Sequence, residues 1–313
     1  MRRLIAVVAS LAVSTVALAA PQFINILTGG TSGVYYPLGV GLSQIYGKVM
    51  PDAKATVQAT KASVENLNLL QDGKGEVAFA LGDSVSDAWK GNTEAGFKAP
   101  LTKLRAIGGI YSNYIQIIAR TDANIRTLAD LKGKRVSVGA AKSGTELNTR
   151  EILKAAGMSY KDMGKVEYLG YAESVDLLKN RQLDATLQSS GLGAAFVKDL
   201  AAAVDITIVA IPVDVAKKIE DAAYLSAVIP KETYAKQAAD VPTVAIRNML
   251  VTSEAVPEEV VYKMTKAMFE SLPQLVASHS AAKDIDRATA ASNLPIPLHP
   301  GAIRYYKEVG VLK

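Results

Sequence analysis

Two glycine-rich turns contain residue types that can hold an anion. Residues 28–33 read Thr-Gly-Gly-Thr-Ser-Gly and residues 139–145 read Gly-Ala-Ala-Lys-Ser-Gly-Thr, and each turn lies between a β-rich run and a helical pattern. Glycines allow backbone N–H groups to approach a ligand, and a helix N-terminus carries about half a positive charge. On its own, the first turn is explained equally well as a plain connection from strand to helix. The second turn favours a carboxylate site, for which we predict these contacts: Gly30, Thr31, Tyr35, Ser143, Gly144 and Thr145.

The sequence offers little that could catalyse a reaction. The first turn lacks both the Lys-Ser/Thr ending of a P-loop and the spacing of a dinucleotide fingerprint. The 2 histidines, His279 and His299, lie late in the chain, and Ser189-Ser190-Gly191 lacks the first glycine of a nucleophile elbow. With 0 Cys, the chain has no cysteine nucleophile, thiolate metal site or disulfide framework. We predict a binding protein without metal or cofactor. A periplasmic hydrolase is the alternative, and a nucleophile and base together in the cleft would indicate it.

Polar side chains also follow several of the predicted strands. Ligands of open α/β sheets bind beyond the carboxyl ends of the strands, where hydroxyls and amides orient a small polar molecule without reacting with it. For Ser63, Asp83 and Ser143, helix capping is an equally good explanation, and Tyr35 is as compatible with core packing as with a cleft wall. The further predicted ligand contacts are Thr60, Ser63, Asn66, Asp83, Ser84, Tyr111, Gln188 and Ser189.

Short β-rich runs alternate with longer helical patterns from residue 23 onward, which is typical of a mostly parallel α/β sheet. The predicted helices are centred on residues 64–70, 147–153, 174–178 and 258–272. The predicted strands are residues 23–27, 56–59, 77–81, 104–110, 115–120, 135–139, 166–169, 185–187 and 206–211.

The length of 313 residues exceeds the usual size of one compact core, and each half carries its own glycine turn. We therefore predict two α/β lobes joined by two hinge strands, near residues 111–115 and 244–251. Lobe I is discontinuous, with residues 20–112 and 247–313. Lobe II comprises residues 113–246.

The N-terminus has the pattern of a secretory signal peptide over residues 1–19. Arg2 and Arg3 precede an apolar run that ends in small residues, and cleavage after Ala19 fits the small-x-small rule. The run of about 15 apolar residues is shorter than the roughly 20 that span a bilayer. Without cysteine a lipid anchor is excluded. We expect a free, monomeric protein in the periplasm.

The charge pattern argues against nucleic acid as a partner. The formal net charge is +5, from 35 basic and 30 acidic residues, and Arg2 and Arg3 contribute two of these charges. The remaining Lys and Arg residues are scattered among acids, with no basic stripe and no interleaved aromatic residues.

Four segments together resemble the TAXI family, the substrate-binding subunits of one class of tripartite ATP-independent periplasmic (TRAP) transporters. They are residues 28–37 (Thr-Gly-Gly-Thr-Ser-Gly-Val-Tyr-Tyr-Pro), Thr60-x-x-Ser63-x-x-Asn66-Leu67, residues 130–134 (Asp-Leu-Lys-Gly-Lys) with Ser143-Gly144-Thr145, and residues 294–302 (Leu-Pro-Ile-Pro-Leu-His-Pro-Gly-Ala). The chain departs from the family pattern at Ser32 and Lys142, where glycine is common.

The resemblance implies a type II periplasmic-binding-protein fold that closes on its ligand and delivers it to a sodium-coupled integral membrane permease of the TRAP type. It also implies a small organic anion as ligand, such as glutamate, 2-oxoglutarate or a related dicarboxylate. Lys142 would add a cation beside the site. Two alternatives remain: a receptor of an ATP-driven (ABC) importer and a sensory receptor, both of which share the fold.

Overall fold

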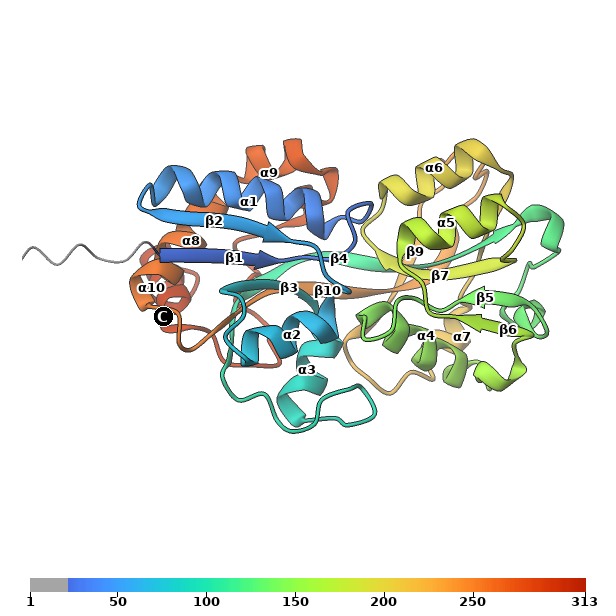
Figure 1. Cartoon of the computed structure of the whole chain (residues 1–313), viewed down its shortest axis with the longest axis horizontal. Coiled ribbons are helices and arrows are strands. Elements are labelled where there is room, and N and C mark those ends of the chain that lie inside the picture. The colour runs from blue at the N-terminus through green and yellow to red at the C-terminus, as the bar shows by residue number, and fades with distance from the viewer. Residues whose placement is uncertain (1–21) are drawn as a thin grey trace, which may run out of the picture.

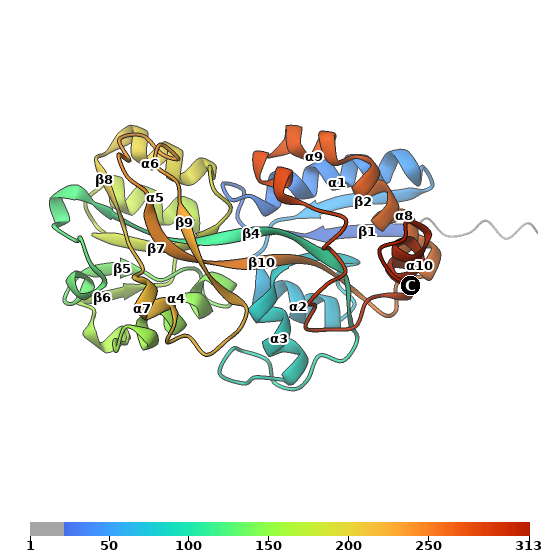
Figure 2. The same cartoon turned by 180° about the vertical axis from the view of Figure 1, so that it is seen from behind.

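The structure of this protein is a computed structural model that describes residues 22–313. The predicted signal peptide lies outside the described residues. The elements form two α/β lobes side by side, with the N-terminal and C-terminal elements in one lobe and the middle of the chain in the other (Figures 1 and 2). The predicted two-lobed α/β class is confirmed.

Lobe I is built around parallel strands. Strand β1 pairs in parallel with β2 and β3, and the helices cover both faces of this sheet. The elements of lobe I are β1 (Gln22–Leu27), α1 (Tyr35–Val49), β2 (Ala53–Gln58), α2 (Ser63–Gln71), β3 (Val77–Leu81), α3 (Gly82–Lys90), α8 (Glu258–Glu270), α9 (Leu272–Ser278) and α10 (Pro300–Glu308).

Lobe II repeats this plan with shorter strands. Strand β5 pairs in parallel with β6 and β7. Its elements are β5 (Arg135–Ser137), α4 (Gly144–Ala155), β6 (Lys165–Glu167), α5 (Tyr171–Lys179), β7 (Ala185–Ser190), α6 (Ala195–Ala203), β8 (Ile206–Val209), α7 (Val213–Ala216) and β9 (Tyr224–Ile229). The described chain also contains four short 3-10 helices, at Thr121–Ala123, Leu128–Leu131, Tyr160–Asp162 and Ser280–Asp284.

Two long antiparallel strands, β4 (Leu104–Arg120) and β10 (Val241–Ser253), run through both lobes. Strand β10 pairs with β3 in lobe I and with β9 in lobe II, while β4 pairs with β7 and β8. The sequence predicts a break in β4 after residue 110, and this is wrong. The strand continues because residues 112–115 pair with β10 and β7, and the buried Asn113 amide donates to Ser189 O at 2.9 Å. The lobe boundaries that we predict fall within these two strands.

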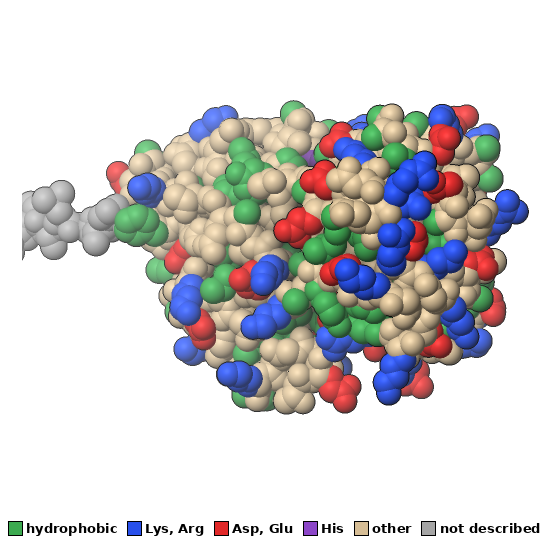
Figure 3. Space-filling model, turned by 45° about the vertical axis from the view of Figure 1, so that its right-hand side comes forward, with side chains coloured by type: hydrophobic (Ala, Val, Ile, Leu, Met, Phe, Trp, Pro, Cys, Tyr) green, Lys and Arg blue, Asp and Glu red, His purple; other side chains and the backbone are tan. Residues whose placement is uncertain are grey.

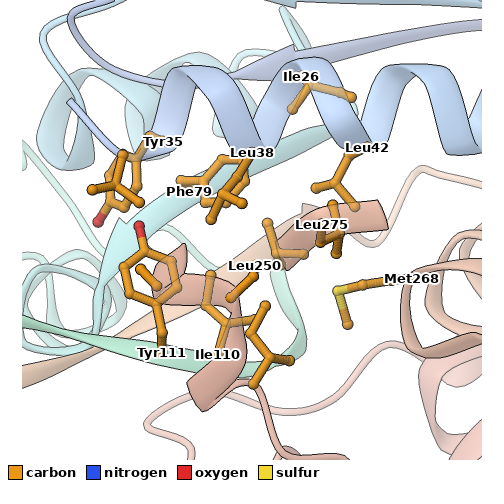
Figure 4. Packing of buried hydrophobic residues seen from close by; sticks show 14 of the residues in the cluster. Ile26, Tyr35, Leu38, Leu42, Phe79, Ile110, Tyr111, Leu250, Met268 and Leu275 are labelled. Atoms are coloured by element: carbon orange, nitrogen blue, oxygen red, sulfur yellow. The ribbon is translucent and has the colours of Figure 1, made fainter. Parts of the chain in front are cut away.

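Helix α1 buries the apolar side chains of one face in the core of lobe I. Leu38, Leu42 and Ile45 recur at helical spacing, and each is about 1% exposed. They pack against residues of β3, β10 and α9, as Figure 4 shows for Phe79 and Leu275. Burying a side chain of this size contributes about 1.5–3 kcal/mol. This packing fixes the N-terminus of α1 at the junction of the lobes.

The surface carries charges of both signs. On the face shown in Figure 3, Lys and Arg side chains alternate with Asp and Glu. Within residues 22–313, no helix has both the length and the apolar composition needed to cross a bilayer.

Candidate ligand-binding site

A pocket of about 450 Å³ lies between the two lobes. This is within the range that holds small organic ligands. Lobe I contributes Gly29, Gly30, Gly33, Val34, Tyr35, Thr60, Lys61 and Ala62, the crossing strand β4 contributes Asn113, and lobe II contributes Ala140, Ala141, Ser143, Thr145, Tyr168, Leu169, Gly170, Tyr171, Glu173, Ser189 and Ser190. We call this the interlobe pocket.

The first turns of two long helices line this pocket, one from each lobe. Val34 and Tyr35 begin α1, and Ser143 and Thr145 begin α4. Ser143 is the N-cap of α4, because its Oγ accepts from Glu146 N–H at 3.2 Å. The capping explanation of Ser143 is therefore confirmed, and the residue lines the pocket as well. The first N–H groups of each helix have no carbonyl partner within the helix and can face an anion.

The side chain of Asn66 anchors the first glycine turn through hydrogen bonds. Its Nδ2 donates to Thr28 O at 2.7 Å and to Phe79 O at 2.8 Å, while its Oδ1 accepts from Thr60 Oγ1 at 2.6 Å. Asn66 is 0% exposed and does not line the pocket. Asn66 holds Thr60 and the first glycine turn in place, and these residues do line the pocket.

A chain of hydrogen bonds crosses the floor of the interlobe pocket. Tyr35 Oη donates to Asn248 Oδ1 at 2.5 Å, and Asn248 Nδ2 donates to Asn113 Oδ1 at 2.8 Å. Asn113 Nδ2 then donates to Ser189 O at 2.9 Å, which also accepts from Tyr171 Oη at 2.6 Å. The chain thus joins α1 of lobe I to α5 of lobe II through both crossing strands.

Sequence reasoning missed three members of this chain: Asn113, Asn248 and Tyr171. A signal was present for the two asparagines, because each interrupts an apolar β-rich run. Burial raises the pKa of Tyr171 to about 12, with a lowering contribution from a hydrogen bond with Thr145. At neutral pH Tyr171 is therefore a neutral phenol.

Three buried hydroxyls near the contact of the lobes lack a hydrogen-bond partner among the residues that the structure describes: Ser84 Oγ, Tyr111 Oη and Ser189 Oγ. All three residues are at most about 1% exposed, and of the three only Ser189 belongs to the pocket lining. Figure 4 shows the hydroxyls of Tyr111 and Tyr35 turned toward one another at the end of the core cluster. Burial, with Tyr35 and Tyr171 nearby, raises the pKa of Tyr111 well above its ordinary value.

The predicted contacts divide into two groups. Gly30, Tyr35, Thr60, Ser143, Thr145 and Ser189 line the interlobe pocket. The structure places Thr31, Ser63, Asn66, Asp83, Ser84, Tyr111, Gly144 and Gln188 outside its lining. Thr31 is exposed in the first turn. The contact roles of the second group therefore have no support from the pocket lining.

Ser63, Ser84 and Gly144 lie where the lobes touch. A Cβ atom on Gly144 of lobe II would stand 2.7 Å from Ser63 Oγ and 3.0 Å from Ser84 Oγ of lobe I. Ser63 Oγ accepts from Leu81 N–H at 3.1 Å. Ser63 is the first residue of α2 and makes no cap bond, so its capping explanation is wrong.

Asp83 joins the lobes on the opposite side of the crossing strands. Its Oδ2 accepts from Asn148 Nδ2 at 2.6 Å and from Tyr224 Oη at 2.9 Å, both in lobe II. Its Oδ1 accepts from Ser84 N–H at 2.6 Å, so Asp83 is not the cap of α3. Burial raises the pKa of Asp83 to about 7. The residue lines a second, larger cavity of about 1010 Å³, which lies away from both glycine turns.

Gln188 is 0% exposed and is not part of the lining of the interlobe pocket. Its Nε2 donates to Thr186 Oγ1 at 2.6 Å and to Ser174 Oγ at 3.3 Å. Gln188 and Ser189 face opposite sides of β7, as successive strand residues do, and of these two only Ser189 is in the pocket lining.

Comparison with known proteins agrees with this architecture. A model of the NMT1-like family matches residues 26–310. The chain is similar to PhnD1 from Prochlorococcus marinus in complex with methylphosphonate, at 10% identity and a TM-score of 0.59, over 93% of this chain and 100% of that one. Periplasmic binding protein BugD matches at 13% identity and a TM-score of 0.58, over 93% and 98%. The alkanesulfonate-binding protein SsuA from Xanthomonas axonopodis pv. citri, bound to MOPS, matches at 15% and 0.50, over 93% and 92%. These likenesses show the two-lobed fold of periplasmic binding proteins.

Proposed function

The chain belongs to the NMT1-like family, and on this premise we propose that it is a periplasmic solute-binding receptor. We propose further that it is a receptor of the TAXI type, which binds a small organic anion and delivers it to a TRAP permease. One observation carries the proposal: the first turns of α1 and α4, one from each lobe, line the same pocket.

This geometry couples anion binding to closure of the lobes. A helix N-terminus contributes about 0.3–2 kcal/mol to holding an anion, and each hydrogen bond to a charged group contributes about 1.5–3 kcal/mol. One lobe alone therefore holds the ligand weakly. Both lobes together favour the closed arrangement, in which the permease would recognise the loaded receptor.

The histidines support a receptor over a hydrolase. His279 Nδ1 accepts from Ala281 N–H and His299 Nδ1 accepts from Gly301 N–H, each at 3.1 Å, so both rings cap helices. The residues described around the interlobe pocket include no histidine that could act as a base for Ser189.

Ligand-dependent stabilisation tests the proposed function. Protein purified without refolding is examined by native mass spectrometry for a retained solute, and then screened by thermal shift against C4 to C6 dicarboxylates, oxo acids and amino acids. A true ligand at 100 times its dissociation constant adds about 2.7 kcal/mol to the free energy of unfolding. Stabilisation by a sugar or a metal ion alone contradicts the organic-anion proposal.

Uptake into right-side-out membrane vesicles distinguishes the TRAP receptor from the ABC receptor. Vesicles from the source cells are supplemented with the purified protein and the labelled ligand. We expect uptake to follow a sodium gradient and to continue without ATP. Uptake that requires ATP and ignores sodium identifies the alternative, the receptor of an ABC importer.

A further inference from the structure

The buried carboxylate of Asp83 links the two lobes outside the ligand pocket. Asp83 lies in the first turn of α3 in lobe I and is 3% exposed. Its Oδ2 accepts from Asn148 Nδ2 of α4 at 2.6 Å and from Tyr224 Oη of β9 at 2.9 Å, and both donors belong to lobe II. When the lobes part, as the proposed function requires of the empty receptor, these two bonds break and water reaches the carboxylate.

Helix α4 connects this contact to the interlobe pocket. Ser143 and Thr145 at its start line the pocket, and Asn148, about one turn further along, binds Asp83. Arg150 of the same helix donates to the Glu94 carbonyl of lobe I at 2.8 Å. A ligand that draws α4 toward lobe I therefore also encloses Asp83.

The surroundings of Asp83 favour its neutral form. Burial raises the pKa of Asp83 to about 7, and the negative charges of Asp221 and Asp87 raise it further, while hydrogen bonds from Tyr224 and from Ser84 N–H lower it less. The other charged residues that line this cavity are Lys90, Glu94, Arg150, Glu151, Lys154, Glu220 and Arg247.

The cations of this cavity are engaged elsewhere. Arg150 pairs with Glu146, and Arg247 donates to backbone carbonyls at residues 110, 289 and 292. Lys154 lies 4.0 Å from Glu151. Within the described chain no Lys or Arg forms an ion pair with Asp83, so its negative charge has no compensating partner in the closed arrangement.

Asn148 offers the acceptor that a protonated Asp83 needs. Its Oδ1 is buried and has no donor among the described residues. An amide that turns by about 180° exchanges its oxygen and its NH₂ group, which brings Oδ1 to the position that now faces Asp83 Oδ2 and Tyr224 Oη. The neutral acid can then donate to this oxygen, whereas the carboxylate accepts from the NH₂ group.

From these contacts we propose that closure of the lobes on the ligand is coupled to uptake of a proton by Asp83, a residue outside the pocket. The proton comes from solvent and adds to the carboxylate, so that Asp83 is ionised in the open receptor and neutral in the closed one. The proposal rests on the closure that the proposed function requires, and it adds a regulation by pH. Asp83 is thus a positioning residue, which acts on the ligand through α4.

The coupling predicts the direction and size of the pH dependence. The pKa of Asp83 is about 7 in the closed arrangement, and its ordinary value of 3.8 applies once water surrounds the carboxylate. Because the closed state binds the proton more tightly, closure is favoured at low pH, and this advantage is lost as the pH rises through about 7. The ratio of closed to open receptor should be about tenfold higher at pH 6 than at pH 8.

Isothermal calorimetry with L-glutamate and 2-oxoglutarate tests the coupling, because the charges of these acids do not change between pH 6 and pH 8. We expect the parent to bind about tenfold more tightly at pH 6 than at pH 8. At pH 6 the binding heat should also vary with the ionisation enthalpy of the buffer, since a proton is taken up. Both effects should disappear in Asp83→Asn. Asp72→Asn, which removes an exposed carboxylate, is the control and should follow the parent.

The coupling also predicts a change in the ligand-free receptor. The chain has 0 Cys, so Lys98→Cys in lobe I and Lys161→Cys in lobe II, both at exposed positions, can carry a pair of spin labels. Pulsed electron paramagnetic resonance measures the populations of open and closed spacings. From pH 8 to pH 6 the closed population should gain about tenfold on the open one in the parent and stay constant in Asp83→Asn.

The outcomes separate the coupling from the receptor function. If the parent binds an acid equally well at both pH values, or if Asp83→Asn keeps the pH dependence, the coupling is wrong while the receptor function stands. A purely structural role of Asp83 would lower the affinity of Asp83→Asn equally at both pH values. If neither acid binds, the proposed ligands are wrong and the spin labels decide: a pH-dependent spacing that Asp83→Asn abolishes supports the coupling, and a constant spacing refutes it.

Discussion

Asp83 is a buried carboxylate that accepts hydrogen bonds from both lobes and has no cation beside it in the described structure. It is 3% exposed, and its donors are Ser84 N–H, Asn148 Nδ2 and Tyr224 Oη. Burial is the largest influence on its pKa, and the negative charges of Asp221 and Asp87 raise it further. We therefore expect the junction of the lobes at Asp83 to be sensitive to pH.

The pKa of Asp83 predicts a direction for the pH dependence of stability. The pKa is about 7 in the folded protein and has an ordinary value of 3.8, so the folded state binds the proton more tightly. The resulting stabilisation is complete below about pH 4 and is lost as the pH rises through about 7. A difference of about 3 in pKa corresponds to ~4 kcal/mol.

Thermal melts at pH 5 to 8 check this expectation. The melting temperature of the parent should fall relative to that of Asp83→Asn as the pH rises, because the asparagine cannot ionise. Asp72→Asn, which removes an exposed carboxylate, is the control and should follow the parent. A constant difference between parent and Asp83→Asn across this range would contradict the predicted titration.

Gln188 and Ser189 are neighbours in the sequence with different predicted effects on substitution. Gln188→Ala removes a buried amide that donates to Thr186 and Ser174, so it should lower the free energy of unfolding by about 1–3 kcal/mol. Ligand affinity should change by less than about twofold, because the side chain lies outside the pocket. Urea denaturation and calorimetry measure the two quantities. If Gln188→Ala bound the ligand much more weakly while keeping the stability of the parent, Gln188 would be a ligand contact.

Sequence position alone could identify residues near the site but not the direction of their side chains. The rule that ligands lie beyond strand ends selected Ser189 together with Gln188, although of these two only Ser189 lines the pocket. It could not select Asn113 or Asn248, because both lie inside long strands and meet only when the two crossing strands pair. Contacts of this kind depend on register across more than 100 residues of intervening chain.

At the scale of elements, a glycine of the first turn sets how closely lobe II approaches lobe I. A Cβ atom on Gly33 would stand 2.7 Å from Cε2 of the Tyr171 ring, which begins α5. Real Cβ atoms do not approach other heavy atoms so closely. The turn and the helix can therefore meet in this arrangement only because residue 33 has no side chain.

Gly33→Ala should weaken closure, and Gly47→Ala, a glycine outside the pocket lining, is the control. A Cβ on Gly47 would have no neighbour within 4 Å, and the residue lies in α1. We expect Gly33→Ala to reduce the affinity for the tightest acid of the thermal-shift screen by about tenfold or more, since a shift of Tyr171 disturbs its bond to Ser189 O, while Gly47→Ala retains the affinity of the parent. Equal affinities in the two variants would show that the Gly33 contact is unimportant.

The elements themselves were largely predictable, because hydrophobic periodicity and glycine turns are local signals. The strands at β1, β3 and β5 and the helices α2, α4, α5 and α8 lie where the sequence predicts them. Strand β9 was missed because it is an edge strand and lacks the buried pattern of a central strand. Its Leu225 and Val228 side chains are exposed. The unbroken β4 was missed because polar side chains at its centre are satisfied by tertiary hydrogen bonds.

At the scale of the whole molecule, closure is the property on which the proposed function depends. Contacts between the lobes include the close approach of Gly33 to Tyr171, the Asp83 junction, and the start of α4 against Ser63 and Ser84. The anion site that we propose between the first turns of α1 and α4 makes the start of α4 the decisive contact, because this helix end both lines the pocket and touches the opposite lobe.

Gly144→Val tests this hypothesis. The valine side chain would collide with Ser63 Oγ and Ser84 Oγ of lobe I, which a Cβ already approaches to 2.7 and 3.0 Å, and would hold the start of α4 away from the opposite lobe. Small-angle scattering should show ligand-induced compaction in the parent and none in Gly144→Val, while circular dichroism shows both folded.

Gly47→Ala is the control, because a Cβ there has no neighbour within 4 Å and the residue lies in α1, away from the junction. Since one lobe retains only its own donors, binding by Gly144→Val should also weaken by at least ~10-fold. If Gly144→Val compacts and binds like the parent, the ligand is not held between the first turns of α1 and α4. A complex in which an arginine pairs with the ligand's carboxylate would contradict this site as well.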